Sequence, residues 1–131
     1  MPASNYVKTN SLDFWLRNQS VSQPSQVYVA LYATNPTAAD TGTEISGGGY
    51  TRQQASFSTP SVSGDVAIVQ NTADVTFPQL TSSVGTAAYV GLRDAASGGH
   101  LLFYEALPTA IALEEGYTPY FGTGDLKVTQ K

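Results

Sequence analysis

The sequence contains no cysteine, and only 12% of its residues are charged, against about 25% in an average soluble domain. Without cysteine there is no disulfide framework, no thiol nucleophile and no thiolate metal site. The six Lys and Arg residues are scattered singly among ten Asp and Glu, and the net charge is −4. Because binding to a phosphate backbone needs clustered basic residues, we expect no nucleic-acid partner. So few charges also mean that copies of the chain repel one another weakly.

Long hydrophobic runs are missing as well. No apolar stretch approaches the roughly 18 residues needed to span a bilayer, so we expect no membrane insertion. The opening segment, MPASNYVKTNSLDFWLRNQ, lacks the continuous apolar core of a signal peptide. We therefore expect the protein to be made in the cytoplasm and to leave it only when the cell lyses.

Histidine occurs once, as His100 in DAASGGHLLF, with Asp94 and Ser97 nearby in the sequence. These three residue types could form a catalytic triad. Triad members usually come from separate elements that hold one another at hydrogen-bond distance, which residues of one tight turn rarely achieve. We therefore interpret this segment as a hairpin turn.

The carboxylates do not form a catalytic pair either. Glu114 and Glu115 are adjacent, so an extended chain directs them to opposite faces and a turn directs both to solvent. Glu105 interrupts an apolar strand face, and we expect it at a rim or paired with Arg93 or Arg52. No ligand spacing typical of a metal site is present. We predict no enzyme, no catalytic residue, no metal and no cofactor.

One helix is predicted near the N-terminus. Leu12, Trp15 and Leu16 recur at i, i+3 and i+4 after a polar N-cap at position 10 or 11, which predicts two to three helical turns. Phe14 lies off this stripe, so the helix is apolar over a wide arc. Such a helix needs cover on more than one side, and a neighbouring subunit could supply it.

The rest of the chain reads as short strands separated by turn signals such as QNTAD, AASGGH and GTGD. The central strand is expected at VYVALYA, residues 27–33, which is apolar on both faces. Further strand-like segments are YTRQQASF, DVAIVQ, DVTFP, TAAYVGLRD, HLLFYEAL, TAIAL and DLKVTQ. This spacing predicts a mainly β fold, an antiparallel β-sandwich of jelly-roll or Ig-like type with about seven or eight short strands and one short N-terminal helix. We expect a single domain over residues 1–131, with a helix-and-linker arm at 1–26 and a long loop at 34–49.

The long loop ends in three consecutive glycines within TGTEISGGGYTRQ, residues 41–53. A phosphate-binding loop would need a Lys, a hydroxyl residue and a helix after its last glycine, whereas Tyr, Thr and Arg follow here. The glycines instead indicate unusual backbone angles, or a close approach to another chain, before a strand. We predict contacts between subunits at this loop and at the helix. The predicted interface residues are Leu12, Phe14, Trp15, Leu16, Pro36, Gly47, Gly48, Gly49, Tyr50 and Arg52.

Eight tyrosines in a chain of low charge allow a second interpretation. Aromatic rings can stack on sugars, and Tyr117 and Tyr120 lie close together in GYTPYFGTGD. Tyrosines equally suit the rim of a core or a protein interface. Contact of these two residues with a host glycan therefore stays open as an alternative.

Five segments follow one another along the chain: NSLDFWLRNQ, VYVALYATNPT, GTEISGGGYTRQ, GTAAYVGLRDAASGGHLLFYEAL and GDLKV. A sequence with this succession resembles a family of small bacteriophage virion proteins, labelled tail-fibre or minor structural proteins. The resemblance covers about residues 10–128. It implies a non-enzymatic structural protein, made in the bacterial host cytoplasm and located in the virion. By family analogy we expect a homo-oligomer, a trimer rather than a dimer. We expect this oligomer to decorate or cement the capsid or to form part of the tail, and its partners to be major capsid or tail proteins. The alternative is a carbohydrate-binding adhesin module that contacts the host surface.

Overall fold

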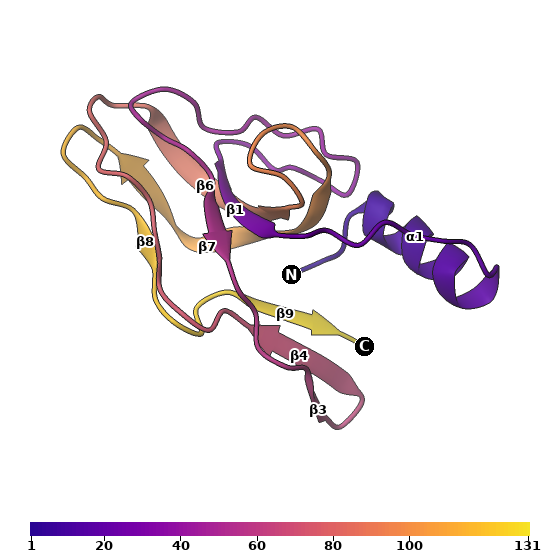
Figure 1. Cartoon of the computed structure of the whole chain (residues 1–131). Coiled ribbons are helices and arrows are strands. Elements are labelled where there is room, and N and C mark those ends of the chain that lie inside the picture. The colour runs from indigo at the N-terminus through magenta and orange to yellow at the C-terminus, as the bar shows by residue number, and fades with distance from the viewer.

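The computed structural model describes residues Met1–Lys131 and contains one helix and nine strands (Figure 1). In chain order the elements are α1 (Asn5–Leu16), β1 (Val27–Tyr32), β2 (Gln53–Ala55), β3 (Ser61–Ser63), β4 (Val66–Gln70), β5 (Val75–Thr76), β6 (Gly85–Arg93), β7 (Leu101–Leu113), β8 (Tyr120–Phe121) and β9 (Lys127–Gln130).

The strands form three antiparallel sheets. The largest has the order β2-β1-β6-β7, a second has the order β3-β4-β9, and β5 pairs with β8. In Figure 1 the β3-β4-β9 sheet lies below the four-stranded sheet. The predicted mainly β, antiparallel fold with one short helix is confirmed, and the packing of the sheets is sandwich-like.

The core lies on the inner face of the four-stranded sheet. β1 is central, as predicted, with β2 and β6 on its two edges, and its residues 29–32 are all buried. Successive side chains point to opposite faces, so both faces of β1 are covered. The buried apolar cluster also draws on the β5 region and the C-terminal segment. Its members are Met1, Val29, Leu31, Ile45, Ala55, Val75, Phe77, Leu80, Ala87, Val90, Leu92, Leu102, Leu113, Leu126 and Val128.

β7 differs from its predicted form. HLLFYEAL and TAIAL, predicted as two segments, form a single 13-residue strand. Ala87 pairs with Ile111 and Tyr89 with Ala106, so two steps along β6 correspond to five along β7. The three extra residues form an irregularity that includes Pro108, which has no N–H to give to a regular ladder.

The helix begins earlier than predicted, at Asn5 instead of position 10 or 11. The reason is Ser4, whose hydroxyl accepts a hydrogen bond from the backbone N–H of Val7 and so caps the first turn. Asp13 consequently lies in the last turns, where it pairs with Arg17 at 2.9 Å. No residue of α1 is buried, and no helix of the structure is long and apolar enough to cross a membrane.

The helix is part of an excursion that is fastened to the body at both ends. Ala3 bridges to Phe103 of β7, and Ser4 N–H donates to the carbonyl oxygen of Leu102. After α1 the chain returns through residues 17–26 and enters the four-stranded sheet at Val27. Figure 1 shows α1 projecting sideways from the sheets, so its far end is held out from the body rather than packed into it.

Candidate functional site

The outer end of α1 carries a cluster of exposed apolar side chains, which we call the helix face. It consists of Leu12, Phe14, Trp15 and Leu16, with 58%, 50%, 76% and 77% of their surface exposed. The rings of Phe14 and Trp15 meet edge to face with centroids 5.1 Å apart, so this part of the cluster is ordered by its own contacts. These are four of the predicted interface residues. At least half of the surface of each residue is left uncovered by the rest of the chain, and their role in docking stays a prediction.

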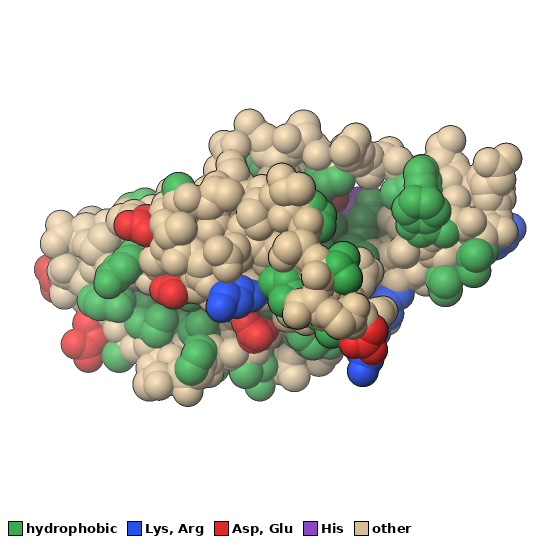
Figure 2. All heavy atoms as spheres, turned by 90° about the horizontal axis from the view of Figure 1, so that it is seen from below, with side chains coloured by type: hydrophobic (Ala, Val, Ile, Leu, Met, Phe, Trp, Pro, Cys, Tyr) green, Lys and Arg blue, Asp and Glu red, His purple; other side chains and the backbone are tan.

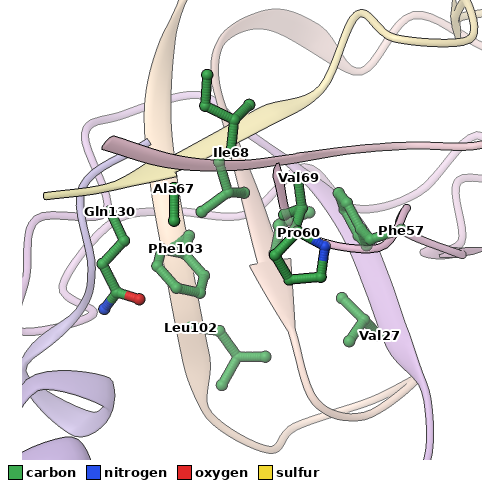
Figure 3. A pocket seen from close by; sticks show the side chains of 11 residues that line it. Val27, Phe57, Pro60, Ala67, Ile68, Val69, Leu102, Phe103 and Gln130 are labelled. Carbon is green, nitrogen blue, oxygen red and sulfur yellow. The ribbon is translucent and has the colours of Figure 1, made fainter. Parts of the chain in front are cut away.

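An open apolar groove lies between the four-stranded sheet and the β4-β9 pair (Figure 3). Its volume is about 320 Å³, and none of its eleven lining residues is charged. In Figure 3, Ala67 and Val69 of β4 face the same space as Leu102 and Phe103 of β7 and Val27 of β1. The full lining is Val27, Phe57, Pro60, Ala67, Ile68, Val69, Leu92, Leu102, Phe103, Val128 and Gln130.

The groove continues into a second hollow beneath the helix. This hollow has a volume of about 490 Å³ and shares Leu102, Phe103 and Gln130 with the groove. Its far wall is formed by α1, including Phe14 and Trp15. Figure 2 shows hydrophobic side chains on the projecting end of the molecule and the hollow between this end and the body. One apolar surface therefore runs from between the sheets to the helix face.

The three glycines of the long loop have positive φ angles of 87°, 60° and 82°. A Cβ on Gly48 would lie 2.9 Å from the carbonyl oxygen of Ser82 and 2.8 Å from a Val84 methyl carbon. The predicted unusual backbone angles are confirmed, and the chain that approaches closely is the protein's own segment at residues 82–84. Contacts of Gly47 and Gly49 with another subunit stay predictions.

Tyr50 and Arg52, also predicted at the interface, have partners within their own chain. The Tyr50 hydroxyl donates to Glu44 and accepts from the N–H of Leu31, both at 2.9 Å. The Arg52 guanidinium donates to both Glu44 carboxylate oxygens at 2.8 and 2.7 Å, and also to the carbonyl oxygen of Ala95 at 2.9 Å. Arg52 is thus a clamp between two loops, with only 8% of its side chain exposed.

Protonation equilibria reflect this packing. Burial raises the pKa of the Tyr50 hydroxyl, so it stays a neutral donor. Burial alone would raise the pKa of Glu44, but hydrogen bonds from Arg52 and Tyr50 outweigh it and hold that pKa below its usual value. Glu44 is therefore an ionised structural anchor of the long loop.

A second clamp holds the middle of the same loop. Arg93 of β6 donates to both carboxylate oxygens of Asp40 at 2.8 and 2.9 Å, and to the hydroxyl of Tyr32 at 2.8 Å. Burial opposes the charge, yet the hydrogen bonds to Asp40 and Tyr32 raise the pKa of Arg93. Pro36 is fully buried in the same loop. Glu105, expected at an edge or rim or beside Arg93 or Arg52, lies on the edge strand β7 with 44% of its side chain exposed, which confirms the rim position; its ionic neighbour is the amino group of Met1 at 4.0 Å and not an arginine.

The segment with the lone histidine brings two of its three polar residues together. His100 Nδ1 lies 2.9 Å from an Asp94 carboxylate oxygen, and the His100 backbone N–H donates to the other oxygen at 2.7 Å. The expectation that such close residues would not reach hydrogen-bond distance is wrong for this pair, because the Gly98-Gly99 turn, with both φ angles positive, folds the chain back. Ser97 forms no hydrogen bond with His100. The outer face of the imidazole is stacked on Tyr6 of α1, with ring centroids 4.0 Å apart.

Tyr117 and Tyr120 are exposed, at 41% and 63%. Neither lines the groove or the hollow beneath α1. Phe121, the neighbour of Tyr120 on β8, turns inward against Phe77. The two tyrosines are therefore accessible to a ligand but lie apart from the apolar surface that joins the sheets to the helix face.

The groove residues were not singled out by sequence reasoning. The predicted strands include four of these residues, Val27, Ala67, Val69 and Val128. Their apolar side chains do not indicate whether the two sheets pack closely over them or leave a space. The one available signal is the small side chain of Ala67 between larger neighbours, which leaves space that a larger residue would fill.

Comparison with known proteins gives one result that bears on identity. No curated protein matches the chain. A family model described as Podophage GP4 fiber I protein gp80 matches residues 2–129, which is almost the whole sequence. The chain therefore belongs to the Podophage GP4 fiber I protein gp80 family, a family of bacteriophage fibre proteins.

Proposed function

We propose that the protein is a non-enzymatic structural subunit of a bacteriophage virion that assembles with copies of itself, as a homotrimer, through the helix face. Membership of a phage fibre family gives it a structural role in the virion, in contact with other virion proteins. Self-assembly, the threefold order and the place of the oligomer, in a tail fibre or as a capsid decoration or cement, are our proposal.

The observation that carries the proposal is the exposure of the helix face. Four large apolar residues within five positions, each at least half exposed, lie at the end of a projecting element. Leu12, Trp15 and Leu16 share one stripe of the helix, and Phe14 contacts this stripe through the ring of Trp15. Monomeric soluble proteins rarely leave such patches uncovered unless they bind something. The patch joins an uncharged groove, so an apolar partner surface would be buried without desolvating charged groups.

The low charge of the whole surface supports the same proposal. Identical copies carry identical net charge, so their association is opposed by repulsion that grows with that charge. A net charge of −4 on 131 residues is a small obstacle, and most ionic groups of the long loop are paired within the chain.

The experiment is virion incorporation. Phage carrying either the natural sequence or Trp15→Ser with Leu16→Gln would be purified, and the protein in the particles quantified by mass spectrometry. We expect the natural protein in particles and the variant depleted at least tenfold, although it accumulates folded in the host. Tyr120→Gln is the matched control, because Tyr120 on β8 is 63% exposed and lines neither the groove nor the hollow beneath α1. Equal incorporation of all three would refute a role for the helix face in the virion.

The carbohydrate alternative rests on the exposure of Tyr117 and Tyr120. Replacing both with Ala should leave binding to host cells unchanged if the protein is purely structural. Loss of binding with normal incorporation would instead favour the adhesin function.

A further inference from the structure

We propose that Trp15 and Leu16 of one copy insert into the apolar groove of a second copy, so that the subunits join head to tail. This inference rests on the proposed self-assembly and specifies how it occurs. The two complementary surfaces are the helix face, which projects, and the groove between the sheets, which is open and unoccupied by the chain's own side chains.

The chain cannot fill its own groove with its own helix. Residues 3 and 4 are fixed along β7, and Val27 of β1 is paired with Ala55 of β2, so both ends of the excursion are held. Within one copy, Phe14 and Trp15 reach only the hollow beneath α1, not the groove itself. The helix of a second copy is not tethered to the first copy, so its side chains can reach the groove of the first copy.

The groove matches these side chains in size and chemistry. At about 320 Å³ it is at the small end of ligand clefts, so it fits large side chains but not a helix backbone. A buried indole usually needs a hydrogen-bond partner for its N–H. Gln130 lines the groove, is exposed, and its side-chain amide makes no hydrogen bond in the structure, so its carbonyl oxygen is free to accept from Trp15.

The geometry of such a contact determines the kind of assembly. The helix face and the groove are different surfaces, so the contact is heterologous and each copy has one of each to offer. Head-to-tail contacts close into a ring when the rotation allows it. In a closed ring of three copies, each helix face contacts the groove of the next copy, so no helix face and no groove is left without a partner.

The surface area that one contact would bury favours a closed ring of subunits over a dimer held by a single contact. A large aromatic side chain buries 150–250 Å² on average, so the four partly exposed residues of the helix face offer about 400 Å². With an equal area on the groove, one contact buries about 800 Å², below the roughly 1,200 Å² of a stable complex. In a ring each copy makes two contacts and the last one forms within the assembly, which raises its effective concentration.

Trp15 is the only tryptophan of the chain, so its fluorescence reports directly on the helix face. For the full-length protein we expect the emission to move to shorter wavelength, and acrylamide quenching to fall at least threefold, as concentration rises and oligomer forms. Ala67→Arg should abolish both changes, because it places a charged side chain in the groove without removing any packing. Ser63→Arg on the neighbouring strand β3 is the matched control, because Ser63 is exposed and pairs with Val66, which does not line the groove, so this variant should behave like the natural protein.

Mixing two variants tests the head-to-tail arrangement. Ala67→Arg keeps Trp15 but has a blocked groove, while the double variant Trp15→Ser, Leu16→Gln keeps the groove but has no tryptophan. Neither variant alone should show protected emission at any concentration. The mixture can form only one contact and no ring, so it should show protected emission only at concentrations well above those at which the natural protein assembles. No change on mixing, or protected emission from Ala67→Arg alone, would overturn the proposal.

Two further outcomes separate this inference from the proposed function. An oligomer in which Trp15 stays as quenchable as in the monomer would overturn the groove contact and leave self-assembly standing. A monomer at every concentration would overturn both.

Discussion

At the scale of single residues, the glycine-rich loop shows how a motif that resembles a ligand site serves the fold. Gly48 adopts a φ of 60°, and a Cβ at this position would lie 2.9 Å from the carbonyl oxygen of Ser82. The Gly48 carbonyl oxygen accepts a hydrogen bond from Thr81. Glycine is therefore required at position 48 for two reasons: the backbone has a positive φ angle, and there is no room for a Cβ atom.

These two requirements can be separated by substitution. Gly48→Ala should lower the free energy of unfolding by about 3 kcal/mol, of which roughly 1–2 kcal/mol reflects a left-handed backbone and the rest the clash with Ser82. Gly64 has a φ of 65°, but no atom lies within 4 Å of the position that a Cβ would take there, so Gly64→Ala should cost only the backbone part. Urea unfolding of both variants measures the difference, and equal losses would contradict a close approach at Gly48.

Glu44 is the residue whose charge the loop depends on. Glu44→Gln leaves the Arg52 guanidinium, with 8% of its side chain exposed, without its anion. We expect a loss of about 2 kcal/mol at pH 7, less than for a fully buried pair because Glu44 is itself 25% exposed. Chemical unfolding at fixed pH measures this loss.

The same carboxylate gives a prediction for pH. Because its pKa is lowered in the folded protein, the stability it contributes is complete above its ordinary value of 4.5 and is lost as the pH falls through the lowered folded value. The difference in unfolding free energy between the natural protein and Glu44→Gln should therefore shrink between pH 6 and pH 3. A difference that stays constant over this range would show that Glu44 does not titrate as the structure implies.

At the scale of elements, α1 is held by its first turn and free at its last. Ser4 caps it, and Tyr6 stacks on His100, whereas the apolar side chains from Leu12 onward are at least half exposed. Local stability follows such differences in packing. In the monomer, amide hydrogens of residues 12–16 should exchange much faster than those of β1 and β6.

Hydrogen exchange followed by mass spectrometry at low and high protein concentration tests this behaviour. We expect protection of residues 12–16 to rise at least tenfold in the oligomer, while β1 stays unchanged. Oligomers with an unprotected helix would show that another surface makes the contact.

The elements also show how far the sequence predicts the fold. β1 was predicted because an apolar run on both faces is typical of a central strand. β3 and β8 were missed because three and two residues, SVS and YF, carry too little pattern to distinguish a strand from a turn. The start of α1 was missed because its first two turns, NYVKTNS, lack a clear apolar stripe, and the Ser4 cap is recognisable only with its tertiary contacts to β7.

At the scale of the whole molecule, the sequence predicted a β-sandwich and one short helix that is apolar over a wide arc, but not the groove. The groove depends on how far apart the sheets stand, which no local pattern encodes. The partners of the two buried arginines could not be predicted either, since Arg52 meets Glu44 and Arg93 meets Asp40 only once the long loop folds back over the sheet. The interface residues expected in that loop, Pro36, Tyr50 and Arg52, were found in intrachain contacts for the same reason.

A deletion of residues 1–19 is a poor probe of the helix face. It would remove the Ala3 bridge, the Ser4 hydrogen bonds and the buried Met1 together with α1, and so expose part of the core. Surface substitutions on α1 leave these contacts intact, because Trp15 and Leu16 bury little of their surface in the monomer.

The most direct measurement is therefore the solution mass, by light scattering, of the natural protein and of Trp15→Ser with Leu16→Gln. We predict three times the chain mass of 13.8 kDa for the natural protein and a single chain mass for the variant, with Tyr120→Gln remaining trimeric. A natural protein that stays monomeric, or a double variant that assembles as well as the natural protein, would contradict the account of α1 as the assembly surface.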